Sequence, residues 1–278
     1  MANYTAADIK ALRERTGAGM MDVKKALDEA NGDAEKAIEI IRIKGLKGAT
    51  KREGRSTAEG LVAAKVDGKV GVMIEVNCET DFVAKADKFI QLADKVLAVA
   101  VESGAADLET LLATDVDGKP LSEVVVEEGA VLGEKVVVRR ISRIEGATVD
   151  AYLHKTSKDL PAQVGVLFAV DGEGEAAATA AHDVAVHIAA MAPNYLSRED
   201  VPADLVESER RIAEETAKAE GKPEAAMTKI VEGRVTGFYK GEVLVDQAFA
   251  KDAKKSVAQV LEEAGVKGTA FTRFRVGS

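Results

Sequence analysis

Hydrophobic residues recur at helical spacing in three short segments near the N-terminus. The first segment follows Thr5-Ala6-Ala7-Asp8, a pattern typical of a helix capping box, and Gly17 and Gly19 separate it from the second. Asn31-Gly32-Asp33 predicts a turn, after which Asp33 can cap a third helix. The apolar positions of the second helix are Met20, Val23, Ala26, Leu27 and Ala30. We predict a helical domain over residues 1–43, which is small enough to act as a binding element or to lean on a larger body.

After residue 43 the pattern changes. Residues 44–56 are basic and contain glycine, and we interpret them as a linker. Residues 61–66 and 70–76 then predict two strands, with a hairpin signal at Asp67-Gly68 between them. A stripe of apolar positions at helical spacing follows and predicts one amphipathic helix. Its members are Phe82, Ala86, Phe89, Ala93, Val96, Leu97 and Ala100.

The same order of elements returns in the second half of the chain. Residues 149–153 predict a strand, and after a polar connection residues 164–170 repeat the pattern of residues 70–76. A helix follows, and each half then closes with acidic residues, a glycine and a final strand. We therefore predict an α+β fold with two related subdomains, each a small antiparallel sheet packed on helices. The expected boundaries are 57–146 and 147–278.

A helical arm is expected within the second subdomain, at about residues 204–235. Residues 204–219 predict one helix, Gly221-Lys222-Pro223 turns the chain, and residues 225–235 predict a second helix. The apolar positions are few: Leu205, Ile212, Met227, Ile230 and Val231. The arm is either a solvated protrusion or a coiled-coil-type contact with a partner or a second copy of the chain.

Charge and cysteine content narrow the classes of partner and compartment. The formal net charge is −9, and an acidic chain lacks the basic face that phosphate neutralisation requires, so we expect no stable nucleic-acid complex. Cys78 is the only cysteine, which excludes an intramolecular disulfide and favours a reducing compartment. We find no secretory signal and no run approaching the roughly 20 apolar residues that span a bilayer. We therefore expect a cytoplasmic protein without a membrane segment.

One basic cluster stands out against this acidic background. Its members are Arg42, Lys44, Lys47, Lys51, Arg52 and Arg55, opposed only by Glu53. The cluster is either a solvated segment or a contact with an acidic protein or RNA.

Common catalytic and cofactor-binding motifs are missing from the sequence. It has neither a phosphate-binding loop nor a dinucleotide fingerprint. His182 and His187 are spaced so that they fall on different faces of a helix, and Cys78 has no neighbouring Cys or His. We therefore expect no metal site, no thiol nucleophile, no catalytic residues and no cofactor. The sequence indicates a protein that is not an enzyme.

The segment Thr80-Asp81-Phe82-Val83 lies where a strand passes into a helix, and it has two interpretations. In the first, Thr80 or Asp81 caps the helix and Phe82 begins its buried stripe, which the pattern alone favours. In the second, the turn projects Asp81 and Phe82 outward. Phe82 would then wedge into a partner, and Asp81 would compete with the groups that hold a metal ion there.

Four motifs resemble the elongation factor Ts family of translation, and they follow the family's order along nearly the whole chain. They are Leu12–Asp22, Asn77–Ala84, His187–Pro193 and Ile230–Arg234. The resemblance implies a ubiquitin-associated-like N-terminal domain, a two-part core and a helical arm. It also implies a partner, elongation factor Tu, bound with GDP and without nucleotide. It leaves open a homodimer within that complex.

The resemblance further implies guanine nucleotide exchange on that partner. Thr80, Asp81, Phe82 and Val83 would enter beside the partner's magnesium ion and displace it. GDP would then lose its main counter-charge and leave faster, so that GTP can rebind. The residues that resemble partner contacts are Arg13, Met20, Met21, Lys24 and His154. Some family members continue past the last strand with a further helix that contacts the partner, and we expect that contact to be missing here.

Two of these positions carry expectations from the residues themselves. Met20 and Met21 lie about 100° apart on a helix, so at least one should be accessible to a partner. His187 is expected to be packed or hydrogen-bonded within its subdomain. Two other functions stay open: a binding adaptor that uses the N-terminal domain, and an RNA-associated factor that uses the basic stretch.

Overall fold

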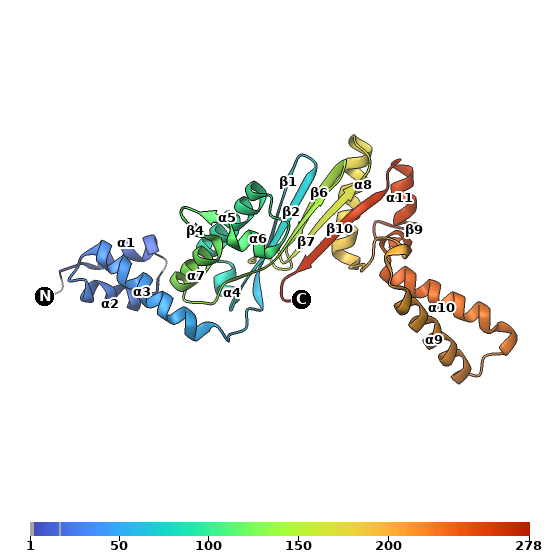
Figure 1. Cartoon of the computed structure of the whole chain (residues 1–278), viewed down its shortest axis with the longest axis horizontal. Coiled ribbons are helices and arrows are strands. Elements are labelled where there is room, and N and C mark those ends of the chain that lie inside the picture. Colours follow the sequence, from blue (N-terminus) through green and yellow to red (C-terminus); the bar gives the residue numbers. More distant parts are fainter. Residues whose placement is uncertain (1–2, 17) are drawn as a thin grey trace.

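The computed structural model describes residues 3–16 and 18–278 (Figure 1). Gly17, which we expected to end the first helix, lies outside the described residues. The molecule is elongated, with the N-terminal helices at one end, two sheets and their helices in the centre, and a helical arm at the other end. The expected α+β class is confirmed.

The N-terminal domain contains the three helices that the sequence predicts. They are α1 (Ala6–Thr16), α2 (Met20–Glu29) and α3 (Ala34–Arg52). The capping box forms before α1, because the Thr5 amide donates to Asp8 Oδ2 (2.7 Å) and the Asp8 amide donates to Thr5 Oγ1 (3.2 Å). Asn31 and Gly32 turn the chain with φ of 52° and 87°, and Asp33 then caps α3 through its Oδ1 (3.1 Å). Local chemistry therefore sets both helix starts.

The expected linker over residues 44–56 is mostly helical, because α3 continues to residue 52. Helix α3 packs against α7 (Leu121–Leu132) of the core. Gly45 permits this contact, since a Cβ at that position would lie 2.9 Å from the Ala130 side chain. An ion pair between Arg42 and Glu127 adds to it. Packing on the core thus stabilises a helix where glycine and charge predicted an irregular segment. The side chain of Lys47, part of the basic stretch, lies outside the described part.

The first subdomain contains a three-stranded antiparallel sheet of order β1-β2-β5. Its strands are β1 (Glu59–Asp67), β2 (Val70–Cys78) and β5 (Val137–Glu145). The predicted hairpin joins β1 to β2, with Gly68 at a φ of 60°. Helices cover one face of the sheet and form an apolar core with it. They are α4 (Asp81–Ala84), α5 (Asp87–Ser103), α6 (Leu108–Ala113) and α7, which follows a short hairpin of β3 (Asp115–Val116) and β4 (Lys119–Pro120).

The second subdomain repeats this arrangement. Its strands are β6 (Thr148–His154), β7 (Val164–Val170) and β10 (Gly268–Arg275), again antiparallel in the order β6-β7-β10. Helix α8 (Glu175–Met191) covers the sheet as α5 does. A short hairpin of β8 (Ala248–Phe249) and β9 (Asp252–Ser256) then precedes α11 (Val257–Glu263), as β3 and β4 precede α7. The predicted repeat is confirmed, and it extends to a hairpin that the sequence analysis did not identify.

The two sheets pack face to face through the sides that their helices leave free (Figure 1). Met73 of β2 and Leu167 of β7 are fully buried at this interface, together with Val62 and Phe274. Because side chains alternate along a strand, β2 and β7 each contribute to a helix-covered core on one side and to this interface on the other.

Two glycines bring the sheets close together. Gly71 of β2 and Gly165 of β7 occupy matching positions in the two halves. A Cβ at Gly165 would lie 2.4 Å from Val62 Cγ1, and one at Gly71 would lie 2.8 Å from Val149 Cγ1. Any side chain at either position would force the strands apart.

A buried ion pair connects the first sheet to the end of the chain. The Glu75 carboxylate is fully buried and accepts hydrogen bonds from Arg140 Nε (2.6 Å) and Asn77 Nδ2 (3.1 Å). Arg140 also donates to the carbonyl of Arg275 (3.0 Å), and its guanidinium lies 4.4 Å from the centre of the Phe274 ring. A buried carboxylate is tolerated when it is paired in this way, so the contact ties β5 to β10.

The arm consists of α9 (Ala203–Ala219) and α10 (Met227–Glu242), and α10 continues beyond the expected end at residue 235. Short 3-10 turns flank or join these helices at Arg198–Asp200, Glu224–Ala226 and Leu244–Asp246. The two helices contact each other through a small apolar cluster. Its buried members are Ala213, Val231 and Val235, and Val206, Met227 and Tyr239 pack against them. Ile212, one of the apolar positions noted in the sequence, is instead 47% exposed.

His187 of α8 is buried, as expected. Its Nδ1 accepts a hydrogen bond from the Ala250 amide (3.0 Å), so Nε2 carries the proton and donates to Gln247 Oε1 (2.8 Å). Burial lowers the pKa of His187, because the charged ring would lose its contact with water. The ring is therefore held in its neutral form.

We expect Gly165→Ala to lower the free energy of unfolding by about 1–3 kcal/mol, the usual cost of overpacking a core. The new methyl group would contact Val62 and Met73. Chemical denaturation measures the effect. Gly233→Ala is the matched control. Gly233 lies on α10, and a Cβ at this position would have no neighbouring atom within 4 Å. It should be neutral or stabilise by up to about 1 kcal/mol. Equal effects of the two substitutions would contradict the proposed close approach of the sheets.

His187 should make stability depend on pH. An unfolded histidine has a pKa of about 6.5, and the folded-state pKa is lower, so between the two values only the unfolded state binds the proton. The free energy of unfolding should therefore fall as the pH decreases from about 6.5, by at most about 1.4 kcal/mol per pH unit. Chemical denaturation across this range should show a smaller fall for His187→Gln. His154 is exposed, so His154→Gln is the control. This variant should show the same change of unfolding free energy with pH as the native protein.

Candidate functional site

The turn between β2 and α4 projects an aromatic side chain into solvent. Thr80 has an extended backbone and caps α4, its hydroxyl accepting a hydrogen bond from the Val83 amide (3.4 Å). Helix α4 contains only four residues. Phe82 lies within it and is 74% exposed, so its ring contributes little to the core.

The single helix predicted from Phe82 to Ala100 is in fact divided in two. Ala86 has an extended backbone (φ −74°, ψ 134°) and is the residue from which α5 begins. The buried stripe belongs to α5 and consists of Phe89, Leu92, Ala93, Val96 and Ala100. The interpretation of Phe82 as the start of that stripe is wrong, because the break at Ala86 changes the phase of the helical repeat.

Two glutamates hold the turn to the chain that follows α7. Glu134 Oε2 accepts hydrogen bonds from the amides of Glu79 and Thr80 (both 3.0 Å), and Oε1 accepts one from the Thr80 hydroxyl (2.5 Å). In return, Glu79 accepts a hydrogen bond from the Lys135 amide (2.7 Å) and pairs with Arg55 (3.1 Å). Glu134 could not be identified from the sequence, because it lies 54 residues beyond Thr80 and no local pattern connects the two residues.

Lys85 lies beside both exposed side chains of the turn. Its Nζ is 3.3 Å from Asp81 Oδ2 and 4.5 Å from the centre of the Phe82 ring. An exposed ion pair at this helical spacing contributes only about 0.3–0.5 kcal/mol. The contact is therefore easily opened, which leaves Asp81 and Phe82 accessible to a partner.

Cys78 ends β2 and lies directly before the turn. Its thiol is buried and donates a hydrogen bond to the Thr80 carbonyl (3.3 Å). Burial raises the pKa of Cys78 to about 12, and the nearby Glu134 carboxylate adds to the effect. The thiol stays protonated at neutral pH, so it packs and donates rather than acting as a nucleophile.

The N-terminal contact residues lie on a different element. Met20 and Met21, at the start of α2, are 58% and 61% exposed. Met20 therefore does not belong to the buried face of α2, which begins at Val23. Arg13 of α1 and Lys24 of α2 are exposed as well. All four predicted residues of the N-terminal domain are thus accessible to a partner.

This domain is tied to the element that follows the turn. Lys88 Nζ, in the first helical turn of α5, donates to the Arg15 carbonyl near the end of α1 (3.0 Å). The contact joins the N-terminal domain to the first subdomain beside the α4–α5 region.

His154 lies on the second subdomain, as the last residue of the edge strand β6. Its ring is exposed, with Nδ1 3.2 Å from the hydroxyl oxygen of Tyr152. His182, on the helix beside this strand, places Nδ1 3.2 Å from Asp150 Oδ2 and is exposed, unlike His187. Burial raises the pKa of Asp150. The predicted contact residues therefore lie on three surfaces of the chain and not in one cluster.

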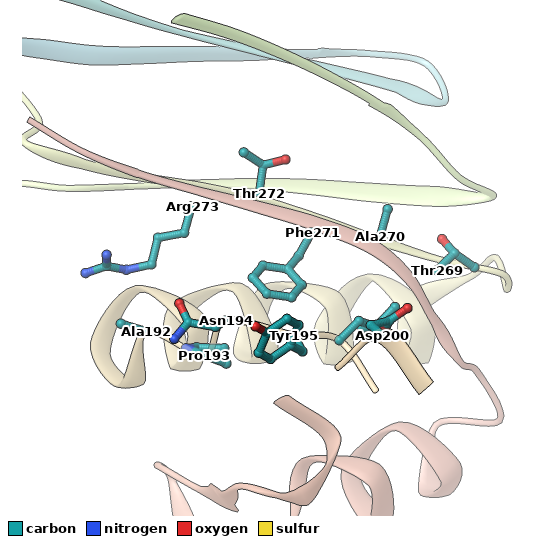
Figure 2. Close-up of a pocket in the computed structure, with 11 residues that line it drawn as sticks. Ala192, Pro193, Asn194, Tyr195, Asp200, Thr269, Ala270, Phe271, Thr272 and Arg273 are labelled. Carbon is teal, nitrogen blue, oxygen red and sulfur yellow. The ribbon is translucent and has the colours of Figure 1, made fainter. Parts of the chain in front are cut away.

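A cleft of about 520 Å³ lies between β10 and the segment that follows α8 (Figure 2). Phe271 points from β10 towards Tyr195, and Arg273 lies farther along the same side of the strand. Arg273 donates to the Ala189 carbonyl (3.2 Å), and Asp200 accepts from the Ser197 amide (2.8 Å). Both charged side chains are thus engaged within the protein. This cleft was not predicted from the sequence, although the motif His187–Pro193 ends on its wall.

Two further findings concern membrane-spanning helices and metal ligands among the described residues. Across residues 3–16 and 18–278, no helix combines the length and apolar character needed to cross a bilayer. Within the same ranges, no three His, Cys, Asp or Glu side chains are grouped as ligands for a metal ion.

Comparison with known proteins gives one family. The family model described as Elongation factor TS matches residues 79–278, which include the turn and the whole second subdomain. The chain is 97% identical over 278 residues to elongation factor Ts of Arthrobacter sp. (strain FB24), with both chains covered in full. Full-length similarity also extends to elongation factor Ts of Renibacterium salmoninarum, at 78% identity, and of Kineococcus radiotolerans, at 57%.

The exposure of Phe82 predicts that its truncation leaves the fold stable. We expect Phe82→Ala to change the free energy of unfolding by less than about 1 kcal/mol, as for surface substitutions in general. Phe89→Ala is the matched comparison, because Phe89 is fully buried, and it should cost about 3–5 kcal/mol. Thermal and chemical denaturation of the two variants test this. A loss of several kcal/mol for Phe82→Ala would mean that the ring is a core residue.

Proposed function

Because the chain belongs to the elongation factor Ts family, we propose that it is a guanine nucleotide exchange factor for elongation factor Tu. It binds the partner in its GDP form, promotes release of GDP and stays bound to the nucleotide-free partner until GTP enters. It makes and breaks no covalent bond, so it is not an enzyme.

The observation that carries this proposal is the exposure of Phe82 on a short, capped turn. An aromatic side chain that is already oriented loses little conformational freedom on binding and can fill a pocket on a partner. In the proposed mechanism Phe82 wedges into the partner beside its magnesium site. Thr80 and Val83 shape the same turn.

Asp81 supplies the charge for this step. Its carboxylate is about half exposed, and among the described residues its side-chain partner is Lys85, so it can be brought to the edge of the partner's site. A carboxylate there competes with the groups that hold the magnesium ion. Once the ion leaves, the diphosphate loses its main counter-charge. Each ~1.4 kcal/mol removed from the dissociation barrier speeds GDP release about tenfold.

Exchange of this kind is a linkage between two ligands of one protein. The factor and GDP each weaken the binding of the other, by the same factor in both directions. Binding of the factor therefore expels nucleotide, and binding of GTP in turn releases the factor. The factor is recovered unchanged, which allows a small amount of it to serve many copies of the partner.

Further contacts strengthen the binding of the factor to its partner. We assign Arg13, Met20, Met21 and Lys24 to the partner's nucleotide-binding domain, and His154 to a separate contact made by the second subdomain. The exposure of both methionines supports the first assignment, because methionine adapts well to a partner's surface. The exposure of His154 at the end of the edge strand β6 supports the second.

Stopped-flow release of fluorescent GDP from elongation factor Tu tests the function. The protein should accelerate release at substoichiometric amounts. Phe82→Ala should reduce the acceleration by about tenfold or more, as expected for a central aromatic contact, and Asp81→Ala should also reduce it. If Asp81 acts on the magnesium ion, the effect of the factor should depend on magnesium concentration.

Met191→Ala is the matched control for Phe82→Ala. Met191 is also a large exposed apolar residue, at 49%, but it lies at the end of α8. This variant should keep full activity. Binding of the partner without any acceleration of GDP release would contradict exchange and favour an adaptor role.

A further inference from the structure

The geometry points to Glu134 as the positioning residue for Phe82, an inference that rests on the proposed exchange function. The carboxylate of Glu134 fixes the backbone and the capping hydroxyl of the turn. It thereby sets the direction in which Phe82 projects before any partner is bound.

The direction in which the Phe82 side chain projects is set by the conformation of its backbone and not by contacts of its ring. The ring is 74% exposed, and the contact made to its face comes from the mobile end of a lysine, Lys85. A helix of four residues is also far too short to be stable by itself. The orientation of α4 therefore depends on how its N-cap residue, Thr80, is held.

Glu134 accepts three hydrogen bonds from the turn, two of them from Thr80 and one from Glu79. One carboxylate oxygen accepts the amides of Glu79 and Thr80, and the other accepts the Thr80 hydroxyl at 2.5 Å. Hydrogen bonds to a carboxylate are shorter and stronger than those between neutral groups. Because the hydroxyl donates to Glu134, its lone pairs remain free to accept from the Val83 amide. The cap of α4 is therefore oriented by Glu134.

Glu134 is itself fixed by the end of α7. Gly133 adopts the left-handed conformation (φ 80°, ψ 8°) that ends a helix. The amides of Gly133 and Glu134 both donate to the Gly129 carbonyl, at 2.9 and 3.1 Å. This backbone arrangement determines where the Glu134 side chain begins, so a hydrogen-bonded helix end presents the carboxylate to the turn.

A second carboxylate keeps the two segments together when Glu134 is changed. Glu79 accepts the Lys135 amide at 2.7 Å and is paired with Arg55. Substitution of Glu134 should therefore loosen the turn without detaching β2 from the start of β5. The order of the turn can therefore be changed while the overall fold is kept.

Hydrogen exchange in the free protein tests the positioning directly. In Glu134→Ala the amides of Glu79 and Thr80 should exchange about tenfold faster or more, because their acceptor is gone, while the amides of α5 and β2 keep their protection. Glu134→Gln keeps one carbonyl oxygen and should give an intermediate result. Glu123→Ala is the control, because Glu123 is an exposed glutamate on the neighbouring helix α7, and it should change nothing at the turn. Unchanged exchange at Glu79 and Thr80 in Glu134→Ala would overturn the inference.

GDP release shows whether the positioning acts through Phe82. Glu134→Ala should reduce the acceleration about fivefold in the native background, but less than about twofold when Phe82 is already alanine. Equal reductions in both backgrounds would mean that Glu134 acts by another route and would overturn the inference. If the native protein itself fails to accelerate GDP release, the proposed function is wrong. Hydrogen exchange then decides by itself whether Glu134 orders the turn.

Discussion

The close contact between the two sheets at Gly71 and Gly165 is the constraint on which the arrangement of the molecule depends. At both positions a Cβ would collide with the opposite sheet, so the central strands β2 and β7 approach as bare backbone. Their alternate residues then serve two purposes, one set entering a helix-covered core and the other filling the shared interface. The buried pair of Glu75 and Arg140 closes one edge of this interface. The two subdomains are therefore joined by a buried interface, with the turn after β2 on one subdomain and the end of β6 on the other.

The turn illustrates how a fold keeps a contact residue both exposed and ordered. Phe82 gains nothing from the core of the free protein, so packing cannot hold it. Hydrogen bonds to the backbone and to the Thr80 cap replace packing, and they come from acidic side chains that tolerate contact with water. The order is local, because it involves a four-residue helix and its cap. A partner then meets an aromatic ring whose conformational freedom is already restricted, which favours tight binding.

The features that the sequence predicted well are those that depend on neighbouring residues. The capping box at Thr5, the turn at Asn31 and the hairpin at Asp67-Gly68 each follow from short-range chemistry. The predictions that were wrong depended on contacts between distant residues or on breaks that no characteristic residue marks. Helix α3 continues past its glycines because Gly45 packs on Ala130, and the break before α5 falls at Ala86, a residue that favours helices. Glu134 could not be found from spacing, whereas the roles of Arg13, Lys24 and His154 remain predictions from family resemblance.

The repeated order of elements also shows where this fold tolerates an inserted segment. In the second half, the arm occupies the place that α6 has in the first: both follow the long helix on the sheet and precede a short hairpin. A connection of six helical residues in one half thus corresponds to a complete two-helix projection in the other, with both cores preserved. The equivalent place in the first subdomain is the segment between α5 and β3, which contains α6. A foreign helical hairpin grafted there would give the molecule a second projection and leave the spacing between the sheets untouched.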